Sequence, residues 1–133
     1  MSTDEIKEAA ALLYSPGEPR QGSTESHETL IDLVRLRFPR KPYCLVEKWT
    51  VFQVDVTAEQ LTSIHAAGQL PLILFAHNVI FDSERRFDVG DWVRTSMCIS
   101  LDESVFETRN TVYVLLGAGY EKSVTLKEIL SFF

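Results

Sequence analysis

The stretch of residues 89–117, VGDWVRTSMCISLDESVFETRNTVYVLLG, constrains the fold more than any other part of the chain. Apolar residues recur at alternate positions through Val93, Met97, Ile99 and Leu101, and they then crowd together in the run VYVLL. Alternation with a period of two is typical of a half-buried β-strand. The stretch therefore predicts two or three successive antiparallel strands, and we expect the rest of the chain to pack around them.

Helix signals lie on both sides of this stretch. Thr57 and Gln60 have the spacing of a capping box, in which the hydroxyl accepts from a backbone amide and the glutamine side chain reaches back. Gly68 stands where a left-handed residue commonly ends a helix. Apolar spacing and capping residues predict helices over 3–14, 28–37 and 58–67, and a terminal helix capped by Ser123 or Thr125. The Gly, Pro and Ser content of residues 16–26 predicts a loop.

Two further strands are expected before the opening stretch. They run over 43–54, with a bulge near Lys48, and over 70–81. Turn residues between Phe81 and Trp92 predict a hairpin, and residues 102–104 predict the next turn. The predicted fold class is α+β, with a mainly antiparallel sheet of about four to five strands and N-terminal, central and C-terminal helices.

The length of 133 residues fits one domain. Within it we expect an acidic helix and a mobile loop over 1–27, followed by an α+β core over 28–133. Cys44 and Cys98 lie in apolar runs, which predicts buried free thiols in a reducing compartment. The N-terminus lacks a basic leader, and the longest apolar run is too short and too polar to span a bilayer. The sequence thus predicts a cytoplasmic protein without a membrane partner.

The formal net charge of -6 argues against general affinity for nucleic acid, because phosphates favour a basic surface. Basic side chains nevertheless gather in one short region that contains Arg35, Arg37, Arg40, Lys41 and Lys48. Nucleic-acid binding through residues 35–49 is therefore kept as a hypothesis, although a solvated connection between two elements explains the same charges.

His77 is the main candidate for a catalytic residue. The predicted hairpin brings this histidine toward Arg94, Thr95 or Ser96, and Asp82 and Arg86 follow on the same strand and its turn. A histidine beside a carboxylate and a hydroxyl can act as a general base, and arginines can hold a phosphate or carboxylate. The alternative is that these polar groups are satisfied by neighbouring strands. Three scattered histidines and two apolar cysteines lack ligand spacing, so no metal and no cofactor is expected.

A second group of polar residues lies on the opening stretch. If its strands pair through the turn at 102–104, these residues face one another, either as a ladder that stabilises the sheet or as a polar recognition surface. Trp92 is either an exposed anchor for a partner or a core residue. The candidate binding residues are Trp92, Arg94, Thr95, Glu107, Arg109 and Asn110.

The segments GDWVRTS and ETRNTVYVLLGAG resemble a small bacterial domain family of unknown function that is associated with pseudomonad genomes and prophage-like neighbourhoods. The resemblance covers about residues 72–124. It implies a stand-alone bacterial or phage-derived accessory protein, and it assigns no catalytic residue.

Three functional hypotheses result. The first is a non-catalytic protein-binding accessory module of bacterial or phage origin, with a host or phage protein as its partner. The second is a small hydrolase, or an enzyme acting on a nucleotide or phosphate ester, with His77, Asp82, Arg86 and Arg94 in one cleft. The third is nucleic-acid binding through residues 35–49. A homodimer formed by edge pairing of the strand at 43–54 is also possible.

Overall fold

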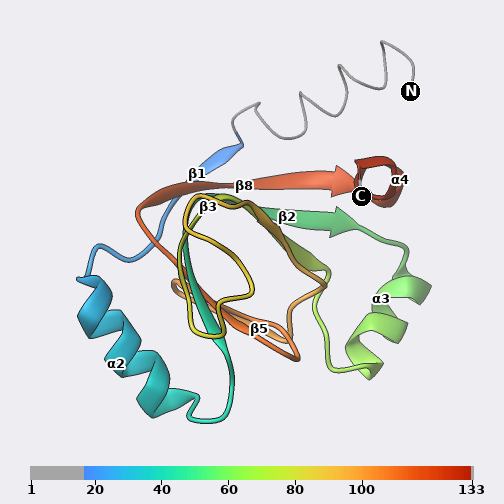
Figure 1. The fold of residues 1–133 in the computed structure, drawn as a ribbon. Helices are drawn as coiled ribbons and strands as arrows, with labels where there is room; N and C mark the ends of the chain where they lie inside the picture. The colour runs from blue at the N-terminus through green and yellow to red at the C-terminus, as the bar shows by residue number, and fades with distance from the viewer. Residues whose placement is uncertain (1–16, 133) are drawn as a thin grey trace.

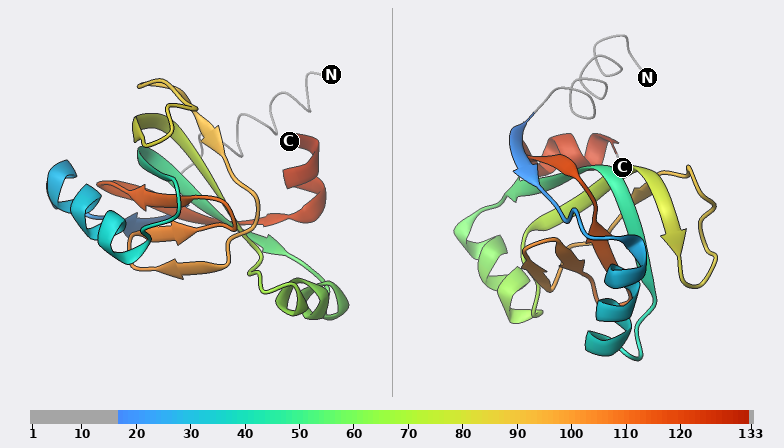
Figure 2. Two further views of the ribbon diagram at one scale, coloured as in Figure 1. Left: turned by 60° about the horizontal axis from the view of Figure 1, so that its bottom comes forward. Right: turned by 90° about the vertical axis from the view of Figure 1, so that its left-hand side faces the viewer.

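The computed structural model describes residues 17–132 (Figure 1). The helix expected over 3–14 lies outside the described residues. The described elements are β1 (Glu18–Gln21), α2 (His27–Arg37), β2 (Tyr43–Asp55), α3 (Ala58–Ala66), β3 (Leu72–Asp82), β4 (Val93–Arg94), β5 (Ser100–Asp102), β6 (Val105–Glu107), β7 (Val112–Leu115), β8 (Ala118–Thr125) and α4 (Leu126–Phe132). The strands form one curled sheet, and α2 and α3 lie on opposite sides of the molecule (Figures 1 and 2).

The long strand β2 is the centre of this sheet. Along one side it pairs antiparallel with β3, which in turn pairs with the short strand β4. Along the other side it pairs in parallel first with β7 and then with β8. The sheet continues through β6 and β5 beyond β7, and through β1 beyond β8. Because β2 is paired on both sides, it offers no free edge for the strand pairing between two copies that the sequence suggested.

The predicted mainly antiparallel sheet of four to five strands is wrong, because the described sheet has eight strands and is mixed. The prediction paired each strand with the next one along the chain. Instead, β7 and β8 run in the same direction as β2, although about 70 residues separate them, since Tyr43 faces Val112 and Thr50 faces Tyr120. The loop expected over 16–26 contains β1, which pairs with β8.

The caps and the turn predicted from neighbouring residues are present in the structure. Thr57 and Gln60 form the capping box of α3, and Gly68 follows that helix with a φ of 74°. Thr125 and Glu128 exchange hydrogen bonds at the start of α4, which confirms Thr125 as its cap. A hairpin joins β5 to β6 through residues 103 and 104, as expected. These features depend only on neighbouring residues.

The expected irregularity near Lys48 is also present, since this residue has a φ of 54° in the middle of β2. It lies between the half of β2 that pairs with β7 and the half that pairs with β8. Val46 and Trp49, three residues apart, belong to the same apolar cluster, so the alternation of faces shifts at this point. The strand can therefore bend and serve two different partners.

Three apolar clusters fill the two faces of the sheet. The inner face of the curl holds the largest, which includes Trp49, Phe106 and both cysteines. The outer face holds one cluster beneath α2, around Leu30 and Val34, and another beneath α4. The second outer cluster contains Phe52, Val54, Phe75, Val124 and Ile129. Phe75 of this second cluster contacts the rings of Trp92 and His77, which are described next.

Candidate functional site

An exposed tryptophan stacked on a buried phenylalanine is the most distinctive surface feature of the described residues. Trp92 is 61% exposed, and its ring lies 5.7 Å from the Phe75 ring at an interplanar angle of 19°. Phe75 is only 5% exposed and belongs to the outer cluster beneath α4. The indole thus has one face fixed by the core while much of its surface meets solvent.

The pairing of β3 with β4 places the other members of this surface. Phe75 lies opposite Arg94, and Ala76 lies opposite Val93, so His77 comes opposite Trp92 one position further. The His77 ring meets the edge of Phe75 at a centroid distance of 4.8 Å. The expected hairpin therefore does bring His77 near Arg94. We call Trp92, Arg94, Phe75 and His77 the Trp92 surface.

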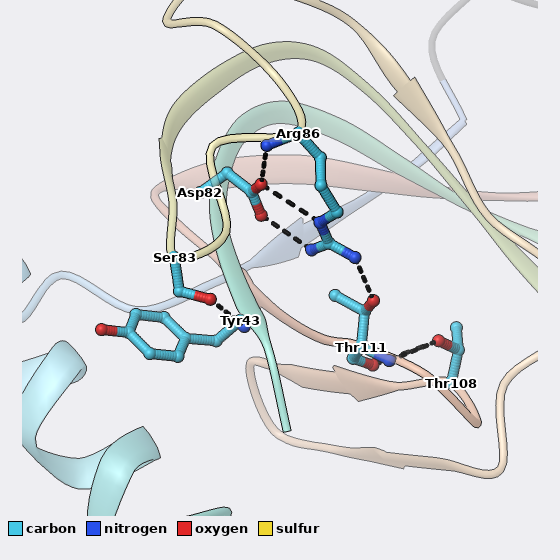
Figure 3. A network of polar contacts seen from close by, with 6 residues as sticks. All are labelled: Tyr43, Asp82, Ser83, Arg86, Thr108 and Thr111. Carbon is cyan, nitrogen blue, oxygen red and sulfur yellow. Dashed lines mark hydrogen bonds and ion pairs between the residues drawn. The ribbon is translucent and has the colours of Figure 1, made fainter. Parts of the chain in front are cut away.

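Asp82 and Arg86 belong to a different part of the molecule, at the end of β3 (Figure 3). Both carboxylate oxygens of Asp82 accept hydrogen bonds from the Arg86 guanidinium, at 2.7 and 3.1 Å, and the Arg86 backbone amide donates a further bond of 2.6 Å. The same guanidinium donates to the Thr111 hydroxyl at 2.8 Å. Hydrogen bonding to Asp82 is the main cause that raises the pKa of Arg86. We call Asp82, Arg86 and Thr111 the Asp82 network.

The Asp82 network ties the end of β3 to the start of β7. The Asp82 side chain is fully buried, and its neighbour Ser83 exchanges hydrogen bonds with the backbone of Tyr43 at the start of β2. His77 and Asp82 are five positions apart on β3, which corresponds to about 16 Å. The four residues proposed for a catalytic cluster are thus divided between two places, His77 with Arg94 and Asp82 with Arg86.

Thr95, a candidate binding residue, is buried and holds the chain after β4 against β3. Its hydroxyl accepts a hydrogen bond from the Leu74 amide at 3.0 Å and donates one to the Ser96 carbonyl at 2.8 Å. The Thr95 amide donates to the Leu74 carbonyl as well. The role of Thr95 in the structure is therefore to attach the segment that carries Trp92 and Arg94.

Of the remaining candidates, Glu107 ends β6, and Arg109 and Asn110 lie between β6 and β7. None of the three is on a strand that pairs with β4. Glu107 accepts a 2.5 Å hydrogen bond from the Lys41 ammonium, which also donates to the Thr108 carbonyl. Arg109 donates to the Ala67 carbonyl at the end of α3, and Asn110 is exposed. The polar ladder expected between 92–101 and 105–116 does not form, because the hairpin there spans only three pairs.

The basic region at 35–49 is partly neutralised within the fold. Arg37 forms an ion pair with Asp102 at 3.1 Å, and Lys41 pairs with Glu107 as described above. Arg35 and Arg40 are exposed. The region thus presents fewer open cations to a phosphate backbone than its sequence suggests.

Both cysteines are free and buried. Burial, together with the nearby Asp82 charge, raises the pKa of Cys44 from 9.0 to about 12, and burial raises the pKa of Cys98 to about 11. A protonated thiol is a poor nucleophile, so neither side chain suits covalent chemistry near neutral pH. Across residues 17–132, no group of three or more His, Cys, Asp or Glu is placed to hold a metal ion. No helix of this range is long and apolar enough to cross a membrane.

The sequence did not predict the residues that contact these candidates and hold them in position. Phe75 supports Trp92, Thr111 completes the Asp82 network, and Lys41 pairs with Glu107. Phe75 lies 17 positions from Trp92, and Thr111 lies 25 positions from Arg86. No local pattern links such distant positions, and only the topology of the sheet brings them together.

The family described as Domain of unknown function (DUF6957) matches residues 21–131. The chain belongs to this family. The DUF6957 match begins with the last residue of β1 and ends within α4, so it includes the whole Trp92 surface and the whole Asp82 network. No curated protein and no solved structure matches the chain.

Proposed function

We propose that this DUF6957 chain is a non-catalytic protein-binding accessory module of bacterial or mobile-element origin, which acts in the cytoplasm by occupying a surface on a host or phage protein. The observation that carries the proposal is the stacking of exposed Trp92 on buried Phe75. The resemblance of GDWVRTS and ETRNTVYVLLG to a pseudomonad and prophage-associated family supports the origin, and the two buried free thiols support a reducing compartment.

The Trp92 surface has the composition of a protein-binding anchor. Tryptophan and arginine are enriched among the few residues that supply most of the binding energy in protein interfaces. Because Phe75 already holds one face of the indole, burying its exposed part against a partner costs little side-chain freedom. Arg94 lies on the paired strand and adds a planar cation that can contact a carboxylate or an aromatic ring of the partner.

The groups proposed for catalysis are engaged in a manner that favours a structural role. Asp82 is fully buried and its two oxygens accept from Arg86, while Arg86 also reaches Thr111. A general acid or base needs access to the substrate within hydrogen-bonding distance. The enzymatic hypothesis stays a prediction. Of its four residues, only His77 and Arg94 lie on paired strands of the same surface.

The test is capture of partners from lysate of a bacterial host by the tagged full-length chain, with and without nuclease. Three baits are compared: the unchanged chain, Trp92→Ala, and Val89→Ala as the matched control. Val89 is 77% exposed and lies on the same connection between β3 and β4, but it is not part of the stack. Circular dichroism and thermal unfolding establish that each bait is folded.

One dominant protein that survives nuclease, is retained by Val89→Ala and is lost from Trp92→Ala supports the proposal. The purified partner must then bind the unchanged chain directly. Loss of all captured material after nuclease would favour nucleic-acid binding instead. A partner retained equally by both variants would overturn the assignment of binding to the Trp92 surface.

A further inference from the structure

Glu47 is a half-buried carboxylate on β2 that has no ion pair among residues 17–132. Its Oε1 atom accepts a 2.6 Å hydrogen bond from the Asn78 side-chain amide on β3. No other hydrogen bond from the described residues reaches this carboxylate. Glutamates are seldom buried without a cationic partner. The second oxygen of Glu47 is therefore available to a donor from another molecule.

Glu47 lies on the same face of the sheet as the Trp92 surface. Leu45, two positions before Glu47, belongs to the outer cluster beneath α2, so alternation places Glu47 on the outer face. Phe52, further along β2, belongs to the outer cluster beneath α4, together with Phe75 under the Trp92 ring. Glu47 thus lies between the parts of the outer face that α2 and α4 cover.

The strand register places Glu47 close to Trp92. Asn78 lies opposite Glu47, and the preceding residue of β3, His77, comes opposite Trp92. Adjacent strands are about 4.8 Å apart and successive residues about 3.3 Å, so about 10 Å separates the Cα atoms of Glu47 and Trp92. A Cβ at Gly90 would lie 4.0 Å from Asn78 Oδ1, so the segment that carries Trp92 borders the Glu47–Asn78 pair.

Trp92 and Glu47 can bind the same cation by different means. The face of an indole attracts a guanidinium placed within about 6 Å of the ring centroid. A carboxylate oxygen accepts a short, charge-assisted hydrogen bond. Arginine can make both contacts at once, because its planar guanidinium stacks through its face and donates through its edge. Phe75 holds the indole and Asn78 holds the carboxylate, so both groups lose little freedom on binding.

The charge of the chain also favours a basic partner. The formal net charge is -6, which attracts cationic surfaces and raises their rate of association. Asp88 and Asp91 are exposed on the connection that leads to Trp92. Of the cations at this face, Lys48 forms no ion pair with Glu47, and Arg94 lies on the side of Trp92 that is further from Glu47.

We propose that the partner of the Trp92 surface binds through an arginine, whose guanidinium stacks on Trp92 and donates a hydrogen bond to Glu47. The proposal rests on the proposed function and names the chemistry of the partner, which is a basic segment with an exposed arginine. Glu47 then gains the cation that the described part of the fold does not supply.

The experiment is a titration of the ¹⁵N-labelled full-length chain with blocked hexaarginine, followed by the NMR signals of the two indole N–H groups. Trp49 is buried and donates to the Leu116 carbonyl, so its signal is an internal reference. We expect a saturable shift of the Trp92 signal and an unchanged Trp49 signal. Blocked hexalysine carries the same charge, but it should bind more weakly because an ammonium group lacks the planar fork.

A substitution at Glu47 separates a specific contact from general attraction. Glu47→Gln keeps the size of the side chain and the oxygen that accepts from Asn78, but it removes the charge. We expect the dissociation constant for hexaarginine to rise about 10-fold. Asp32→Asn is the matched control, because it removes one charge from an exposed position on α2 and should change the constant by less than about 2-fold.

Equal effects of Glu47→Gln and Asp32→Asn would overturn the proposal, since hexaarginine would then respond only to net charge. A Trp92 signal that does not move, or equal affinities for hexaarginine and hexalysine, would overturn it too. Partner capture from lysate distinguishes the two levels of the account. A partner lost from Trp92→Ala but bound equally by Glu47→Gln would overturn the arginine contact and leave the proposed function standing.

Discussion

Arg86 holds Asp82 through both carboxylate oxygens, at 2.7 and 3.1 Å, across one turn of chain that follows β3. Because Arg86 also donates to Thr111, this pair joins the end of β3 to the start of β7. These strands pair with opposite sides of β2, so the Asp82 network connects the two neighbours of β2 at one end of the sheet. We therefore expect the Asp82 network to stabilise the curled sheet.

Loss of the arginine should destabilise the fold. Breaking a buried ion pair costs about 3 to 5 kcal/mol, and because the Arg86 side chain is 35% exposed, we expect Arg86→Met to cost about 3 kcal/mol. Chemical unfolding in urea measures the loss. Arg85→Met is the control, because Arg85 is the preceding exposed arginine and should matter by less than about 0.5 kcal/mol. Equal effects of the two changes would contradict the structural role of the network.

The pair should also show energetic coupling. Asp82→Asn combined with Arg86→Met should cost less than the sum of the two single changes, because the second change no longer breaks an intact ion pair. A double-mutant cycle by urea unfolding measures this difference. Additive effects would mean that the two side chains stabilise the fold separately.

Alkaline pH should lower the free energy of unfolding. The folded state raises the pKa of Cys44 from 9.0 to about 12 and that of Cys98 to about 11. Above pH 9 the unfolded chain therefore loses protons that the folded chain retains, so stability is full below about pH 9 and falls as pH rises toward 12. At pH 10 we expect a loss of about 1 kcal/mol for each thiol.

Urea unfolding at pH 7 and pH 10 measures the alkaline effect. The Cys44→Ala and Cys98→Ala double variant is less stable at both pH values, but its loss between them should be smaller. Tyr113 contributes to the loss that remains, because burial also raises the pKa of its hydroxyl. An unchanged pH dependence in the double variant would show that the thiols are not its source.

A methyl group at Gly119 should disrupt the inner core. A Cβ placed there would lie 2.4 Å from two atoms of the Trp49 ring, and this ring is only 1% exposed and donates to the Leu116 carbonyl. Overpacking of this kind costs about 3 kcal/mol. Gly68→Ala provides the comparison, because Gly68 has a positive φ but open space around it, and should cost about 1 kcal/mol. If Gly119→Ala costs no more than Gly68→Ala, Trp49 is less tightly held than the structure shows.

The sequence predicted the elements whose causes are local. The capping box at Thr57 and Gln60, the turn between β5 and β6 and the irregularity at Lys48 all follow from residues within a few positions of each other. The parallel pairing of β2 with β7 and β8 did not follow, because alternation marks a strand without naming its partner. The strand β1 was missed because its residues EPRQ carry no strand pattern, and it is held by backbone pairing with β8.

Only the part of the candidate site that depends on local signals was predicted from the sequence. The hairpin between β3 and β4 brought His77, Trp92 and Arg94 to one surface, as the turn signals between them indicated. Asp82 and Arg86 were predicted as catalytic candidates beside His77, but Arg86 contacts Thr111, which directly precedes the sequence-distant strand β7. Alternation could not decide between an exposed and a buried tryptophan, and the structure buries Trp49 while it exposes Trp92.

The most direct test of protein binding through the Trp92 surface is isothermal titration of the captured partner with the unchanged chain, Trp92→Ala and Val89→Ala. Loss of a central tryptophan anchor costs about 2 kcal/mol or more, which corresponds to a dissociation constant raised about 30-fold. We expect this increase for Trp92→Ala and an unchanged constant for Val89→Ala. Equal affinities for all three chains would contradict the proposal that Trp92 is the binding anchor.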